Sequence, residues 1–116
     1  MSASVIVNQK FFGLVELGAD GTVLYSRIEG DSDRPCPAPN ITGRNFFSEI
    51  APFQNVEEFK KCLDSFCRSS QQANSIPFTC LYEDGPVRVK VLLARVRERS
   101  EHDVTKSILV HIRKAQ

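Results

Sequence analysis

Three β-patterned runs in the C-terminal part constrain the fold of this chain more than any other feature. Residues 76–82, 87–96 and 104–112 are rich in valine, isoleucine and leucine, and short polar segments at 83–86 and 98–103 join them. Short connections favour antiparallel neighbours, because a parallel pair needs a crossover of a dozen or more residues. The sequence therefore predicts an antiparallel three-stranded meander.

The middle run changes its alternation part of the way along. Valines occupy every second position from Val87 to Val91, and Arg95 and Arg97 then take the same parity. Because successive side chains of a strand point to opposite faces, this change indicates a β-bulge or a strong twist near residues 92–94.

The first part of the chain adds two more strands. Residues 12–17 and 22–25 are short apolar runs on either side of a turn that contains Asp20-Gly21. An Asp-Gly turn between two such runs is typical of a β-hairpin. Residues 26–40 are polar and contain three prolines, so they are predicted to form a loop.

A short helix is predicted over residues 43–50. It ends before Ala51-Pro52, because the residue that precedes a proline is disfavoured in helical geometry. The residues expected to be buried on this helix are Phe46, Phe47 and Ile50.

A longer helix is predicted over residues 56–70. Asn55 is a suitable N-cap residue, and Glu58 three positions later completes a pattern that resembles a capping box. Apolar side chains then recur at helical spacing, and we expect them to pack in the core. They are Phe59, Cys62, Leu63, Phe66 and Cys67.

The composition fits one soluble domain without cross-links. The chain has 116 residues, of which 41% are hydrophobic and 25% charged, and no apolar run approaches the roughly 20 residues of a membrane span. The four cysteines include no Cys-x-x-Cys pair, and the first residues show no export pattern. We therefore expect free thiols in a cytoplasmic protein.

Two strands, helices and then three antiparallel strands is the order of a PAS domain, and the residues resemble its photoactive yellow protein branch. The matching segments are residues 12–25, Glu29-Gly30-Asp31, residues 43–52, Glu58-Phe59 and residues 87–91. The most specific block is Gly-Arg-Asn-Phe-Phe-x-x-Ile-Ala-Pro at residues 43–52. The resemblance implies a single α+β PAS domain over residues 1–116, with a five-stranded antiparallel sheet and helices on one face.

The resemblance also suggests a ligand cavity. Photoactive members carry a p-coumaroyl thioester on a cysteine directly after the Ala-Pro pair, and a tyrosine and a glutamic acid hold its phenolate. Tyr25 and Glu29 match those two residues, but Phe53 stands at the cysteine position. A phenyl ring forms no thioester, so no p-coumarate chromophore is expected. Tyr25, Glu29, Phe46 and Phe53 are the expected cavity residues, either around a small ligand or as a filled former pocket.

The resemblance implies a signalling role rather than catalysis. The expected function is a sensor that binds a small ligand or cofactor and passes a conformational change to an effector domain or partner, within a histidine kinase or transcription regulator. A homodimer would form through the sheet face, near a basic output surface. The basic residues assigned to that surface are Arg88, Lys90, Arg95, Arg97 and Arg99.

Two alternatives remain open at this point. One is a ligand-free PAS module whose function is homodimerisation. The other is a haem or redox sensor, because Cys36 lies between two prolines and a Cys-Pro dipeptide occurs at some haem sites where a thiolate binds the iron. The predicted helix over residues 56–70, however, contains no histidine that could bind haem iron. No nucleophile motif or phosphate-binding glycine loop is present, so an enzyme is not expected. Direct nucleic-acid binding is disfavoured, because no aromatic residues are interleaved with the basic ones.

Overall fold

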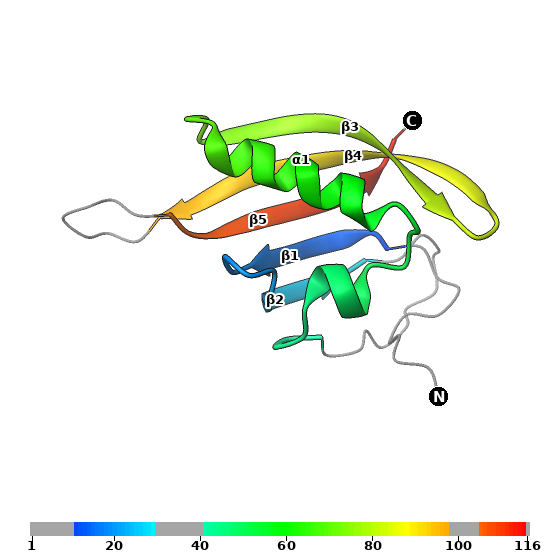
Figure 1. The fold of residues 1–116 in the computed structure, drawn as a ribbon, viewed down its shortest axis with the longest axis horizontal. Coiled ribbons are helices and arrows are strands. Elements are labelled where there is room, and N and C mark those ends of the chain that lie inside the picture. The colour runs from blue at the N-terminus through cyan, green and yellow to red at the C-terminus, as the bar shows by residue number, and fades with distance from the viewer. Residues whose placement is uncertain (1–10, 30–40, 98–104, 116) are drawn as a thin grey trace.

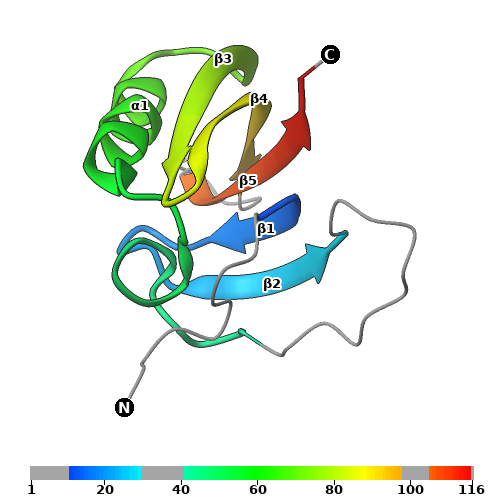
Figure 2. The same cartoon turned by 90° about the vertical axis from the view of Figure 1, so that its right-hand side faces the viewer.

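The computed structural model describes residues 11–29, 41–97 and 105–115. Five strands form one antiparallel sheet in the order β2-β1-β5-β4-β3, and both helices lie on one face of it (Figure 1, Figure 2). The elements are β1 (Gly13–Leu17), β2 (Val23–Ile28), the π-helix η1 (Phe46–Ile50), α1 (Val56–Arg68), β3 (Ala73–Tyr82), β4 (Gly85–Arg97) and β5 (Thr105–Lys114). The expected α+β class and sheet are confirmed. In the described part of the chain, no helix is long and apolar enough to cross a membrane.

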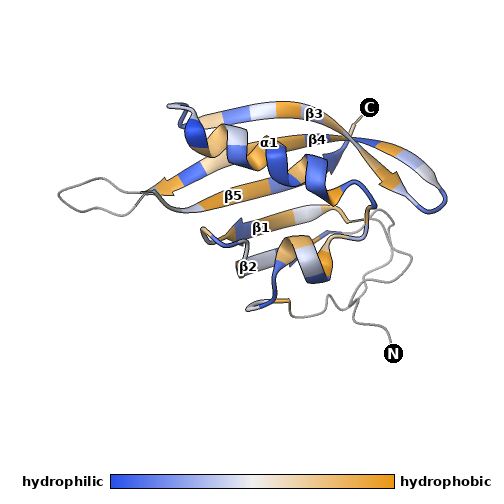
Figure 3. Ribbon diagram, viewed as in Figure 1, coloured by the Kyte–Doolittle hydropathy of each residue, from blue (hydrophilic) through white to orange (hydrophobic). Residues whose placement is uncertain are grey.

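The core lies between the sheet and the helices. Val15, Val110 and Leu93 lie side by side across β1, β5 and β4, and each is at most 2% exposed. Helix α1 packs Phe59 and Leu63 against this face. Figure 3 shows apolar residues throughout the central strands and an alternation of apolar and polar residues along α1, as expected for a half-buried helix.

The two edge strands are longer than the sequence pattern predicted. β2 continues to Ile28, although residues 26–28 were expected to belong to a loop, and β3 begins at Ala73 rather than at Ile76. Apart from half-buried Ile28, the residues of both extensions are polar or exposed, so they show little apolar alternation. Hydrogen bonding to β1 and β4 defines these segments as strands instead.

The predicted β-bulge near residues 92–94 is wrong. β4 pairs with β3 without a register shift, and its shift against β5 falls between Val96 and Arg97. Arg95 therefore remains on the inner face of the sheet, with the same parity as Leu93. It does not join Arg88 and Lys90 on the opposite face, as the predicted output surface required.

Arg95 faces inward because its guanidinium group caps the C-terminal end of α1. Its Nε donates to the Gln71 carbonyl at 2.6 Å, and one terminal nitrogen donates to the carbonyls of Phe66 at 2.7 Å, of Cys67 at 3.1 Å and of Ser69. The group also lies 5.0 Å from the centre of the Phe66 ring. These contacts add a charged donor to carbonyls at the end of the helix, where the regular pattern of hydrogen bonds stops; the Phe66 carbonyl also accepts from the Ser69 backbone N–H and hydroxyl.

Asn55 does not cap α1 with its side chain, contrary to the capping-box prediction. Its amide group instead donates to the Thr79 carbonyl at 2.8 Å and accepts from the Leu81 backbone N–H at 3.0 Å. The side chain therefore connects the start of α1 to the C-terminal part of β3.

Candidate functional site

Phe53, at the position where the resemblance places a chromophore cysteine, lies in a buried aromatic cluster. Its side chain is 3% exposed, and its ring centre lies 5.4 Å from that of Phe59, 6.3 Å from Phe78 and 6.1 Å from Tyr82. All three pairs have edge-type geometry, which is favourable between aromatic rings. The Tyr82 hydroxyl accepts a hydrogen bond from the Phe11 backbone N–H at 2.9 Å. The polar end of the cluster is thus satisfied by the protein itself.

Phe46 extends this cluster from η1. It is fully buried, and its ring centre lies 5.4 Å from Phe11 and 6.0 Å from Phe59. Asn45 fixes its position, because the Asn45 side chain accepts from two backbone N–H groups of η1 and donates to the Asp20 carbonyl at 2.9 Å. Phe46 and Phe53 are therefore brought together through Phe59. Phe47, also expected to be buried, is only half-buried.

Tyr25 does not converge on this cluster, contrary to expectation. It is 49% exposed and pairs with Glu16, whose parity on β1 is opposite to that of buried Val15. Ser26 is the residue that faces the core side, because it pairs with Val15. A register shift between Glu16 and Leu17 alters the pairing of this hairpin, and a displacement of one residue changes the face to which a side chain points.

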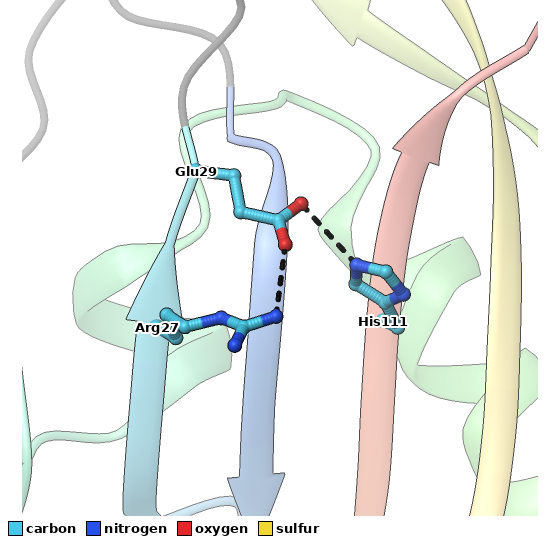
Figure 4. A network of polar contacts seen from close by, with 3 residues as sticks. All are labelled: Arg27, Glu29 and His111. Carbon is cyan, nitrogen blue, oxygen red and sulfur yellow. Dashed lines mark hydrogen bonds and ion pairs between the residues drawn. The ribbon is translucent and has the colours of Figure 1, made fainter. Parts of the chain in front are cut away.

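Glu29 also lies on the face of the sheet away from the helices. Figure 4 shows its carboxylate between two basic groups: one oxygen is 3.3 Å from His111 Nε2, and the other is 3.3 Å from a terminal nitrogen of Arg27. Partial burial raises the pKa of the Glu29 carboxyl, but the hydrogen bonds and charges of His111 and Arg27 outweigh it. The net effect is a pKa below the ordinary value of 4.5.

This lowered pKa predicts a small, pH-dependent contribution to stability. A carboxyl whose pKa is lower in the folded state stabilises the fold above its unfolded-state pKa, and the effect is lost as the pH falls through the folded-state pKa. The Glu29 side chain is 38% exposed, so solvent screening limits the contribution to roughly 0.2–1 kcal/mol. We expect Glu29→Gln to lower the free energy of unfolding by that amount at neutral pH and by almost nothing at about pH 3.

Urea unfolding at the two pH values measures this difference. Glu83→Gln is the matched control, because Glu83 lies exposed in the β3–β4 turn. A loss that is equal at both pH values, or equal to that of the control, would exclude the Glu29 ion pairs as its cause.

The cysteines offer little reactivity in the described structure. Burial raises the pKa of the Cys80 thiol to about 12, although a hydrogen bond with Tyr82 opposes it, and Cys80 is fully buried as expected. Cys62 is half-buried, but Cys67 is exposed, which corrects its assignment to the core. Partial desolvation of the Cys67 thiol nevertheless raises its pKa. Within the described ranges no three histidine, cysteine or acidic residues form a metal-binding group, and Cys36 lies outside those ranges.

The face of the sheet away from the helices, here called the outer sheet face, carries an apolar strip. Leu14, Leu92, Ala94 and Leu109 belong to three neighbouring strands, are half-buried, and line a shallow groove of about 470 Å³ together with His111. The pairings Leu14 with His111 and Ala94 with Leu109 place these side chains on one face. Charged residues on the same face include Glu16, Arg27, Glu29, Arg88, Lys90 and Arg113.

Comparison with known proteins found curated relatives but no matching family model. The chain is 31% identical over 85 residues to the photoactive yellow protein of Rhodothalassium salexigens, a match that covers 72% of the chain and 67% of that protein. It is 27% identical over 85 residues to the photoactive yellow protein of Halochromatium salexigens, and this match covers 73% of the chain and 68% of that protein. It is 35% identical over 81 residues to the photoactive yellow protein of Cereibacter sphaeroides, and this match covers 69% of the chain and 64% of that protein.

Proposed function

Because the chain belongs to the photoactive yellow protein family of PAS domains, we propose that it is a non-enzymatic sensor domain that signals as a homodimer through its outer sheet face. This family is one of sensor proteins rather than enzymes. The main observation in support of a dimer is the apolar strip on the outer sheet face, formed by Leu14, Leu92, Ala94 and Leu109. Both described helices lie on the other face of the sheet (Figure 2). Apolar surface left open in this way marks an interaction site.

The distribution of charge supports a second copy of the chain as the occupant of that face. On the β1–β2 side of the sheet Glu16 and Glu29 outnumber Arg27, whereas the charged residues that β4 and β5 place on this face, Arg88, Lys90 and Arg113, are basic. Two copies related by a two-fold axis, with their sheets face to face, bring the acidic side of each near the basic side of the other. An isologous dimer requires this kind of self-complementary surface.

The trigger is not a thioester chromophore, because Phe53 has no thiol. Its burial among Phe59, Phe78 and Tyr82 supports the alternative in which this part of the interior binds nothing and the domain acts as an interaction module. We propose a cytoplasmic location, which keeps thiols reduced and agrees with the free Cys62, Cys67 and Cys80. The effector is a linked or partner domain of a signalling protein such as a histidine kinase or transcription regulator.

The dimer is tested by a single charge in the apolar strip. Leu109→Arg places a guanidinium group at the centre of the proposed interface, where it would be desolvated without a partner. We expect the wild-type chain to have the mass of a dimer by multi-angle light scattering and the variant to have that of a monomer, with an unchanged circular dichroism spectrum.

Leu24→Arg is the matched control. Leu24 is 44% exposed on β2 and lies outside the groove, so this variant should remain a dimer. A monomeric wild-type chain at its highest soluble concentration, or a Leu109→Arg variant that is still dimeric, would overturn the proposed interface.

A further inference from the structure

A second cavity lies on the helix side of the sheet, away from Phe53. It has a volume of about 360 Å³ and opens between α1, the β1–β2 turn and the ends of β4 and β5. Its apolar lining includes Leu17, Leu63 and Ile108, which are 2%, 4% and 9% exposed, and the ring of Phe47. The volume falls within the range of small-molecule sites, and the lining is as apolar as such sites require.

Hydrogen bonds hold the turn side of this cavity in place. The β1–β2 turn is closed by Gly18 N–H to the Thr22 carbonyl at 2.9 Å, and Asn45 connects it to η1. Gly21 has a φ of +89°, and a Cβ atom there would lie 2.7 Å from the Phe47 ring. Glycine at this position therefore lets the Phe47 ring lie directly against the turn.

Contacts of α1 hold the opposite side. The guanidinium group of Arg95 joins the end of α1 to β4 through the carbonyls described above. Since both sides are fixed by contacts within the protein, the cavity is preformed. A preformed site binds a ligand without the entropic cost of ordering its walls.

Two charged residues of opposite sign, Asp64 and Arg95, line the cavity. Asp64 lines it from α1, is exposed, and makes no hydrogen bond or ion pair with the part of the chain that the structure describes. The Arg95 guanidinium donates to the carbonyls of Gln71, Phe66 and Cys67 at the end of α1. The Asp64 carboxylate is therefore the charged group of this lining that is left to pair with a ligand, and it favours a positive charge on that ligand.

From this arrangement we infer that the cavity binds a small amphiphilic amine, with its apolar body against Leu17, Leu63 and Ile108 and its ammonium group at Asp64. The site is separate from the aromatic cluster around Phe53, and it does not depend on dimerisation. Neither Tyr25 nor Glu29 contributes to it.

Three probes with similar bodies and different charges test the inference: 2-phenylethylamine, 2-phenylethanol and 3-phenylpropionate. Each is titrated into the full ¹⁵N-labelled chain while amide chemical shifts are followed by NMR. We expect saturable shifts at residues 18–21, at Phe47 and at residues 63–67, with the amine bound about threefold to fivefold more tightly than the alcohol, which is the range of an exposed ion pair. The carboxylate should bind most weakly.

Substitutions distinguish the contribution of the Asp64 charge to binding from the contribution of the cavity itself. Asp64→Asn should abolish the difference between amine and alcohol, whereas Glu57→Gln, an exposed acidic position on the same helix outside the cavity, should preserve it. Ala19→Trp places a large side chain at the exposed edge of the cavity and should weaken the binding of all three probes. Equal affinities for amine and alcohol in the wild-type chain, or shifts that map elsewhere, would overturn the proposal.

Discussion

Replacement of Phe53 by alanine is expected to lower the free energy of unfolding by about 3–5 kcal/mol, the range observed when a buried phenylalanine is truncated. Phe53 is 3% exposed, and its ring lies against those of Phe59, Phe78 and Tyr82. Removing it leaves a cavity lined by aromatic edges that the backbone cannot close. Because small domains are stable by only about 5–15 kcal/mol, this loss is a large part of the total.

Denaturant unfolding followed by circular dichroism measures the effect. Leu24→Ala is the control, since Leu24 is 44% exposed and its truncation should change the stability by no more than about 0.5 kcal/mol. If Phe53→Ala is too unstable to isolate, Phe53→Leu keeps most of the volume and should lose less. A loss below about 1 kcal/mol for alanine would contradict the packing described for Phe53.

Arg95→Ala is expected to have the second largest effect, a loss of about 2–4 kcal/mol in the free energy of unfolding, because several hydrogen bonds from one charged donor, a strong class of hydrogen bond, are lost at once. The substitution leaves the last carbonyls of α1 without this donor and removes the contact with the Phe66 ring. Lysine should not restore the stability, since an ammonium group lacks the planar fork that reaches several acceptors at once.

Thermal and urea unfolding of Arg95→Ala, Arg95→Lys and Arg88→Ala separate this role from a general effect of charge. Arg88 is exposed on the outer sheet face, so its truncation should change the stability by no more than about 0.5 kcal/mol. Equal losses for Arg95→Ala and Arg88→Ala would show that the cap contributes little.

Local patterns in the sequence were sufficient to predict most of the fold. The apolar spacing of α1 and the alternation of the last three strands depend on residues close together in the chain, and the predicted helix differs from α1 by two residues at its end. The Asp20-Gly21 turn was likewise a local signal for the β1–β2 hairpin. The edge strands were underestimated because exposed strands need no apolar face.

The errors arose where contacts between distant residues decide the outcome. Arg95 interrupted the apolar parity of β4, and this was interpreted as a bulge because nothing in the sequence shows that the end of α1 lies opposite. The facing of Tyr25 depends on a register shift between two strands, which the residue pattern did not reveal. The pairing of Glu29 with His111 joins residues 82 positions apart and had no local signal.

We propose that this member of the photoactive yellow protein family is a homodimeric sensor domain without a thioester chromophore. Native mass spectrometry of the freshly purified full chain tests both parts in one measurement. We expect a species of twice the 13.0 kDa chain mass with no covalent addition. A species with the mass of one chain, or a covalent addition on either species, would contradict it.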